Sequence, residues 1–401
     1  MATFFLIMIY MTFISLGLPD SLLGVAWPLI RSEFGSPFEA AGLVSMIIAG
    51  GTIVSSFASG AVHKHLSTGK IALISCLMTA LALLGFAFSP ALIWLLLFAI
   101  PLGLGAGSVD AALNNYIATH YKAHHMSWLH CFWGIGATVG PIIMSHFIAG
   151  QNSWRGGYFT VSMIQLSLAA LLFFTLPLWK RMAVEVHKSP ADLKADQESA
   201  AVSSHKEVGK TNYLNIKGVK LSLVSCLFYC GVEATMGLWG SSFLVNVKEL
   251  SAAAAAQWVS LFYGGITVGR LITGFITMKI SNRILIRMGQ TTAFTGVMLL
   301  LLPLPITFSL IGFIFVGLGC APIYPCMLHE TPTRFGKENS QGIMGYQMAL
   351  AYTGSTFLPP ILGFIAARTT IGLLPFFVLS YIIIMFISSE KINMLMKAKN
   401  N

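Results

Sequence analysis

Apolar runs long enough to cross a bilayer recur along the whole chain of 401 residues. A membrane-spanning helix needs about 20 mostly apolar residues, and runs of that length alternate here with short polar segments. The pattern predicts about twelve spanning helices: 3–30, 38–62, 70–88, 91–118, 127–149, 157–179, 219–245, 254–278, 288–304, 306–328, 341–366 and 371–388. Pro303 and Pro305 mark a short connection between the ninth and the tenth.

One long polar segment divides these runs into six and six. Residues 181–217 are rich in Lys, Ser, Asp, Glu and His, a composition typical of a flexible linker. We therefore expect an N-terminal six-helix bundle over residues 1–180, a cytoplasmic linker over 181–217 and a C-terminal six-helix bundle over 218–401.

The two halves repeat one another. Asp20 in the first run is followed four residues later by Gly24, and Glu233 in the seventh run is followed four residues later by Gly237. Glycine doublets in the second and eighth runs match in the same order. Parallel repeats of six helices are known in transporters. The expected fold is an all-α membrane protein with twelve transmembrane helices in two pseudo-symmetric bundles.

Composition and charge support a membrane location. Charged residues make up 9% of the chain, against about 25% in soluble proteins, and mean hydropathy is +0.77. If both termini are cytoplasmic, 19 of the 24 Lys and Arg residues fall in the loops and tails on that side, as the positive-inside rule requires. The net charge of +10 therefore reflects topology and not nucleic-acid binding. We expect a multi-pass protein of the cytoplasmic membrane, a monomer whose partners are lipid, a small solute and protons.

Other classes of function find little support. All six cysteines lie in apolar runs and are expected to be free packing residues. No glycine-rich phosphate loop or HExxH motif is present, which argues against an enzyme, a self-contained ATP-driven pump, a cofactor or a metal. No cleavable signal peptide is expected, since no basic segment precedes the first run.

Four charged residues lie well inside apolar runs: Asp20, Asp110, Glu233 and Arg270. A charge at bilayer depth costs about 2.5 kcal/mol or more, so such residues usually face the bundle interior or a wet cavity. Burial disfavours the charged form of a carboxylate, which suits it to taking up and releasing a proton. Asp20, Asp110 and Glu233 are thus the proton-coupling candidates. For Asp20 the alternative is a structural cap or a lipid-edge position, and for Asp110 it is a helix-packing hydrogen bond.

The expected substrate-binding residues are polar and aromatic side chains inside the runs. Asn114 lies four residues after Asp110 on one helical face, where a carboxylate and an amide suit vicinal hydroxyls; a packing hydrogen bond is the alternative. Arg270 would either clamp an anionic solute or pair permanently with Glu233. The full set is Asn114, Asn115, His130, Trp133, Trp27, Tyr229, Trp239, Arg270, Tyr324 and Gln347. For the aromatic residues the alternative is packing or interface anchoring, and for His130 it is an interhelical hydrogen bond.

The chain resembles the major facilitator superfamily, and within it the fucose-permease-like sugar:proton symporters. The resemblance covers nearly the whole chain. The segments that carry it are GLPDSLLGVAWP at 17–28, DAALNN at 110–115, LHCFWGIGATVGP at 129–141, YCGVEATMGLW at 229–239 and YGGITVGR at 263–270. The resemblance implies a twelve-helix transporter that works by alternating access, with its site near the midplane between the halves.

One position departs from the resembling pattern. The superfamily's usual loop motif after the second span places an aspartate four residues after a glycine, which here would be position 64, after Gly60. The residue there is Lys64, so the cytoplasmic gate is not expected to use the usual aspartate contacts.

The sequence thus predicts a secondary active transporter that moves a small polar solute, most plausibly a sugar, with a proton. The main alternative is proton-coupled efflux of small amphiphilic or drug-like compounds, which a mostly apolar cavity with a single acid would favour. A non-transporting membrane receptor or scaffold, or a flippase or transferase for lipid-linked substrates, is a further alternative.

Overall fold

The computed structural model describes residues 2–63, 65–121, 123–151, 153–186, 213–277 and 279–400. Lys64 and most of the expected linker therefore lie outside the described residues. The helices are α1 (Ala2–Asp20), α2 (Leu22–Phe34), α3 (Ala40–His63), α4 (Thr68–Ala87), α5 (Leu92–His120), α6 (Ala123–Gln151), α7 (Trp154–Val186), η1 (Tyr213–Asn215), α9 (Val219–Asn246), α10 (Ala252–Ile276), α11 (Asn282–Leu301), α12 (Ile306–Phe335), α13 (Lys337–Ala366), η2 (Ile371–Leu373) and α14 (Leu374–Asn400).

Twelve helical spans of the described residues are long and apolar enough to cross a membrane, which confirms the predicted number. Backbone polar groups find no water in a bilayer core, so helices satisfy them internally. The connection at 302–305 between α11 and α12 falls where two prolines predicted it. Several helices run beyond their predicted ends: α14 continues to Asn400 and α7 to Val186.

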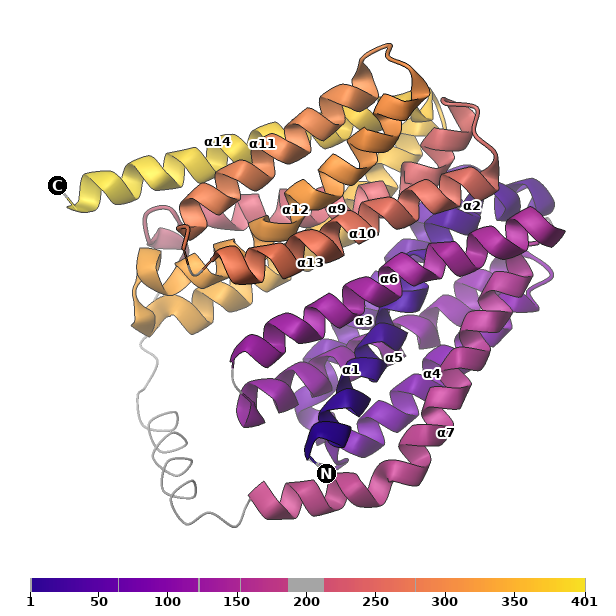
Figure 1. Cartoon of the computed structure of the whole chain (residues 1–401), viewed down its shortest axis with the longest axis horizontal. Coiled ribbons are helices and arrows are strands. Elements are labelled where there is room, and N and C mark those ends of the chain that lie inside the picture. The colour runs from indigo at the N-terminus through magenta and orange to yellow at the C-terminus, as the bar shows by residue number, and fades with distance from the viewer. Residues whose placement is uncertain are drawn as a thin grey trace.

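The helices form two bundles that use the same pairing (Figure 1). In the first bundle α1 packs on α6, α5 packs on both α3 and α4, and α4 packs on α7. In the second bundle α9 packs on α13, α12 packs on both α10 and α11, and α11 packs on α14. Each pair in one bundle has its counterpart in the other, as expected for a duplicated six-helix unit.

The first predicted helix, 3–30, is broken in the structure. α1 ends at Asp20, Ser21 forms a turn, and α2 begins at Leu22. Pro19 precedes the break, and a proline lacks the N–H of a regular helix. The Ser21 hydroxyl donates to the Ala137 carbonyl oxygen of α6 at 3.0 Å, so the break is tied to a neighbouring helix. The break places Asp20 at the end of a helix and not in its middle.

The bundles touch at one end and diverge at the other. At the end away from the linker, Phe38 stacks on Trp239, Ser145 Oγ donates to the Ala253 carbonyl oxygen at 2.9 Å, and Gly42 packs on Pro360. Toward the ends where α7 finishes and α9 begins, Figure 1 shows the two bundles moving apart. The two bundles are thus in contact at the face away from the linker, and their helices lie farther apart toward the linker face.

Candidate functional site

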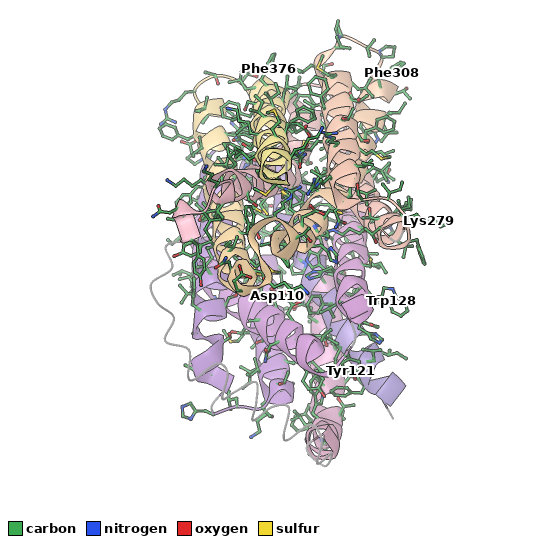
Figure 2. All side chains as sticks on the ribbon, turned by 90° about the vertical axis from the view of Figure 1, so that its left-hand side faces the viewer. Asp110, Tyr121, Trp128, Lys279, Phe308 and Phe376 are labelled. Atoms are coloured by element: carbon green, nitrogen blue, oxygen red, sulfur yellow. The ribbon has the colours of Figure 1, made fainter. Side chains whose placement is uncertain are left out.

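Four of the charged residues inside the spans lie near one another at the boundary between the two bundles. Asp20 ends α1, Asp110 lies on α5, Glu233 on α9 and Arg270 on α10. Asp20 interacts electrostatically with both Asp110 and Glu233. Figure 2, which looks from the linker end, labels Asp110 near the boundary between the bundles. The structure thus brings together groups that the sequence separates by more than two hundred residues.

Asp20 accepts a hydrogen bond from a neutral donor. The Nε1 of Trp133 in α6 donates to Asp20 Oδ2 at 2.7 Å. Asp20 is exposed, although it lies inside a membrane span. Its donor, Trp133, contacts α10 of the other bundle, so this exposed side chain faces the space between the bundles and not lipid. Within the described part of the chain, no cation lies within ion-pair distance of Asp20.

Asp110 is partly buried and engages its own helix. Asn114 Nδ2 donates to Asp110 Oδ1 at 2.9 Å and to the Asp110 carbonyl oxygen at 2.9 Å. The two side chains do share one face, as their spacing predicted. In this conformation Asn114 donates its amide hydrogen bonds to Asp110, so it could donate to a solute only after one of these bonds breaks. Asn115 is exposed beside them.

Glu233 has both a hydroxyl and a cation beside it. The Tyr229 hydroxyl donates to Glu233 Oε2 at 2.6 Å, and an Arg270 terminal nitrogen lies 3.4 Å from the same oxygen. The same nitrogen lies 3.4 Å from the Tyr229 hydroxyl. Both contacts of the arginine are long, and its Nε is buried without a hydrogen-bond partner in the described structure. Arg270 is therefore close to Glu233 but not tightly bound to it.

Trp133 lies between Asp20 and the Arg270–Glu233 pair. Its ring lies under the Arg270 guanidinium, whose Cζ is 5.2 Å from the ring centroid, and it meets Tyr263 edge-on at 6.4 Å. His130, one turn earlier on α6, is exposed, packs edge-on against Phe13 and interacts electrostatically with Arg270. The site therefore has a continuous chain of contacts from Asp20 through the indole to Arg270 and Glu233.

Three predicted substrate-binding residues lie elsewhere and have packing roles. Trp27 and Trp239 are both 0% exposed, and their indole nitrogens donate to the carbonyl oxygens of Phe38 and Pro359 at the face away from the linker. Gln347 is also fully buried and donates to Ser222 at 2.6 Å. These side chains are hydrogen-bonded within the protein in this conformation, and their part in solute binding stays a prediction.

Two tyrosines belong to the cluster although the sequence analysis did not single them out. Tyr263 lies seven residues before Arg270 on the same face of α10, a spacing that was visible in the YGGITVGR segment. Tyr352 on α13 interacts electrostatically with Asp110 and Asp20, and no sequence signal identified it. Tyr324 stacks on Tyr229 with centroids 5.4 Å apart, as a lining residue would.

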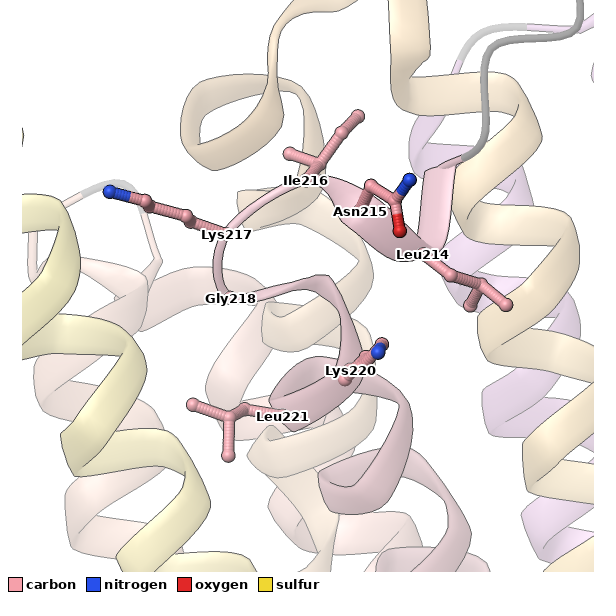
Figure 3. Close-up of a pocket in the computed structure, with 7 residues that line it drawn as sticks. All are labelled: Leu214, Asn215, Ile216, Lys217, Gly218, Lys220 and Leu221. Atoms are coloured by element: carbon pink, nitrogen blue, oxygen red, sulfur yellow. The ribbon is translucent and has the colours of Figure 1, made fainter.

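Surface hollows lie away from this cluster. The pocket drawn in Figure 3 is lined by residues 214–218, Lys220 and Leu221 at the start of α9. It contains none of the predicted site residues. Among the described residues, no group of three His, Cys, Asp or Glu side chains is arranged to hold a metal ion.

Comparison with known proteins gives a consistent result. A sequence model described as the Major Facilitator Superfamily matches residues 4–359. The chain is 25% identical over 360 residues to the "Glucose/galactose transporter" of Brucella abortus biovar 1, with 84% of this chain and 82% of that protein covered. It is 24% identical over 277 residues to "Bypass of stop codon protein 6" of Saccharomyces cerevisiae, a match that spans 67% of this chain but only 56% of that protein's length.

Solved structures match in fold. The inward-open xylose transporter XylE from E. coli superimposes with a TM-score of 0.75 at 12% identity, covering 96% of each chain. A bacterial homologue of the human lysosomal transporter Spinster, in an inward-facing and occupied conformation, gives a TM-score of 0.71 at 12% identity, covering 99% of this chain and 97% of that one. At such identities the likeness establishes the fold alone.

Proposed function

The chain belongs to the Major Facilitator Superfamily, and from this premise we propose that it is a secondary active transporter that moves a neutral monosaccharide together with a proton. The observation that carries the proposal is Asp20, an exposed carboxylate inside a membrane span that accepts a hydrogen bond from an indole N–H and, among the described residues, has no cation within ion-pair distance. A carboxylate with no cation beside it can lose and regain its proton without breaking an ion pair. That property is what a proton carrier needs.

The groups around Asp20 suit a polyol. Trp133 offers an aromatic face close to the acids, and Tyr263 meets it edge-on. Carboxylates accept hydrogen bonds from sugar hydroxyls and arginine donates to them, and an aromatic face packs on the apolar side of a sugar ring. Relatives whose names specify glucose, galactose or mannose support the same solute class.

The alternative of efflux for amphiphilic compounds requires a mostly apolar cavity with a single acid. Three carboxylates, an arginine and an asparagine gather in this site. That density of polar groups favours a small polar solute, because an apolar solute would displace water from these groups without offering them hydrogen bonds in return.

We also propose the orientation. With the linker and both termini on the cytoplasmic side of the cytoplasmic membrane, the face where the bundles are in contact is external and the site opens to the cytoplasm. In this inward-facing state the proton and the sugar would leave to the cytoplasm. The division into 1–180, 181–217 and 218–401 and a monomeric working unit are part of the same proposal.

The test is uptake into proteoliposomes with an imposed pH gradient, across a panel of D-glucose, D-galactose, D-xylose and L-fucose. Wild type is expected to accumulate at least one of these sugars. Asp20→Asn is expected to lose accumulation but keep sugar counterflow, which needs no net proton movement. If no sugar enters, the solute class is wrong. If Asp20→Asn, Asp110→Asn and Glu233→Gln all match wild type in driven uptake and in counterflow, the coupling assignment is wrong.

A further inference from the structure

Trp133 lies between Asp20 of one bundle and Arg270 of the other. It is the one described side chain that both hydrogen-bonds to Asp20 and packs on Arg270. Asp20 belongs to the N-terminal bundle, while Arg270 and Glu233 belong to the C-terminal bundle. The indole is therefore a direct contact between the proton site and the ion pair, beside the electrostatic interaction of Asp20 with Glu233.

The backbone of Trp133 is closely packed in this conformation, so its side chain is the part that can respond first. A Cβ on Gly17 would overlap the Trp133 carbonyl oxygen, which means that α1 and α6 are in backbone contact there. On the next residue, a Cβ on Gly134 would overlap the Thr267 hydroxyl of α10. α6 is thus held on both sides at this point, and α6 and α10 pack extensively. A change at Asp20 would therefore act first on the indole itself.

The indole contacts Asp20 in one bundle and Arg270 in the other, and protonation of Asp20 would change the balance between these two contacts. Its N–H donates to a carboxylate, and such a charge-assisted bond weakens roughly twofold when the acceptor becomes neutral. Its face attracts the guanidinium, an interaction worth about 0.5–2 kcal/mol. The Arg270 contacts to Glu233 and to Tyr229, each 3.4 Å, are long enough to shorten if the guanidinium leaves the ring.

We propose that Trp133 couples proton binding to sugar binding: Asp20 holds the indole while ionised, protonation releases it, and a sugar that then covers the ring moves Arg270 onto Glu233. This inference rests on the proposed sugar:proton symport. No covalent step is involved. The proton moves between water and Asp20, and the arginine moves between an aromatic face and a carboxylate.

Two substitutions of Trp133 test its N–H and its aromatic face separately. Trp133→Phe keeps an aromatic face but has no N–H. Its D-glucose or D-galactose affinity should fall by about threefold, since a smaller ring offers less contact, and should no longer depend on pH. Trp133→Gln keeps an N–H donor without a ring and should bind these sugars poorly at every pH. Trp94→Phe is the matched control, because Trp94 is exposed on α5 and stacks on Phe98.

A sugar-free measurement tests the Asp20 contact alone. Tryptophan emission of the purified protein is titrated with pH, and wild type should show a step that is absent from Trp133→Phe and from Asp20→Asn. Other titratable or charged groups face this region and need their own control, and His130→Asn must retain the step. These groups are His130 on α6, Asp110 on α5, Glu233 on α9, Tyr263 and Arg270 on α10, and Tyr352 on α13.

The outcomes are distinct. A step that persists in Asp20→Asn, or a Trp133→Phe protein whose sugar affinity still follows pH as wild type does, overturns the coupling role and leaves symport standing. Sugar binding that is independent of pH in wild type, together with no proton-driven accumulation, overturns both proposals. If the emission step behaves as expected but neither sugar is transported, the proposed solute class fails while the Asp20–Trp133 contact is upheld.

Discussion

Asp20 and Glu233 occupy matching places in the two repeats, yet their surroundings differ. Asp20 ends a broken helix, is exposed and accepts one hydrogen bond from an indole. Glu233 lies inside the continuous helix α9, is 19% exposed, and has a tyrosine hydroxyl and an arginine beside it. The two repeats thus carry an acid at matching positions, and in the described structure only Glu233 of the two has an arginine within ion-pair distance.

The largest expected effect comes from removing the cation that distinguishes the two acids. Arg270→Met leaves Glu233 with no cation in a largely buried place, where its side chain is only 19% exposed. Breaking a buried pair by deleting one partner costs about 3 kcal/mol, and we expect a loss of that order in thermal unfolding of the purified protein. The double variant Arg270→Met with Glu233→Met should recover most of it. Strict additivity of the two single effects would show that the residues do not act as a pair.

The next effect is on energy coupling and concerns Asp20. One proton moving through 100 mV supplies roughly 2.3 kcal/mol, which corresponds to about 50-fold accumulation of a neutral solute. Asp20→Asn should bring the accumulation ratio in proteoliposomes close to one without lowering the thermal unfolding temperature, because no ion pair is lost. Glu233→Gln, by contrast, should lower that temperature, since it leaves Arg270 without its acid. Equal destabilisation by the two variants would remove the contrast between the acids.

The crossing that holds the two repeats together offers a third test. Gly24 lies four residues after Asp20, and a Cβ there would overlap the carbonyl oxygen of Gly237, four residues after Glu233. Gly24→Ala should therefore destabilise the face where the bundles are in contact by about 2 kcal/mol, a typical cost of overpacking. The readout is labelling of an added cysteine at that face. Gly50→Ala is the matched control, because nothing lies near its added methyl group, and equal labelling in the two variants would contradict the prediction.

The smallest expected effect comes from removing the hydroxyl that donates to Glu233. Tyr229→Phe keeps the ring that stacks on Tyr324 but removes the hydroxyl that donates to Glu233 at 2.6 Å. Loss of one such bond costs about 1 kcal/mol, measurable by thermal unfolding. Tyr346→Phe, on an exposed residue of α13, should change stability much less. If the two substitutions are equivalent, the hydroxyl contributes nothing to the pair.

Most of the fold and part of the candidate site could be predicted from the sequence. The spans followed from length and hydropathy, and the acids stood out because a charge inside an apolar run is costly wherever it lies. The same reasoning could not tell that Trp27, Trp239 and Gln347 are fully buried. An aromatic or amide side chain in a span suits packing as well as solute binding, and only its neighbours distinguish the two roles.

The chain by itself determined twelve helices, their division into two similar halves and the presence of four charges at bilayer depth, because the bilayer imposes its conditions on each segment separately. The tertiary structure alone decided that α1 breaks after Asp20, that Tyr263 and Tyr352 join the acids, and that one indole lies between Asp20 and Arg270. Those contacts join residues from different helices and, in part, from different bundles. Their positions depend on how whole helices pack, which no local pattern in the sequence encodes.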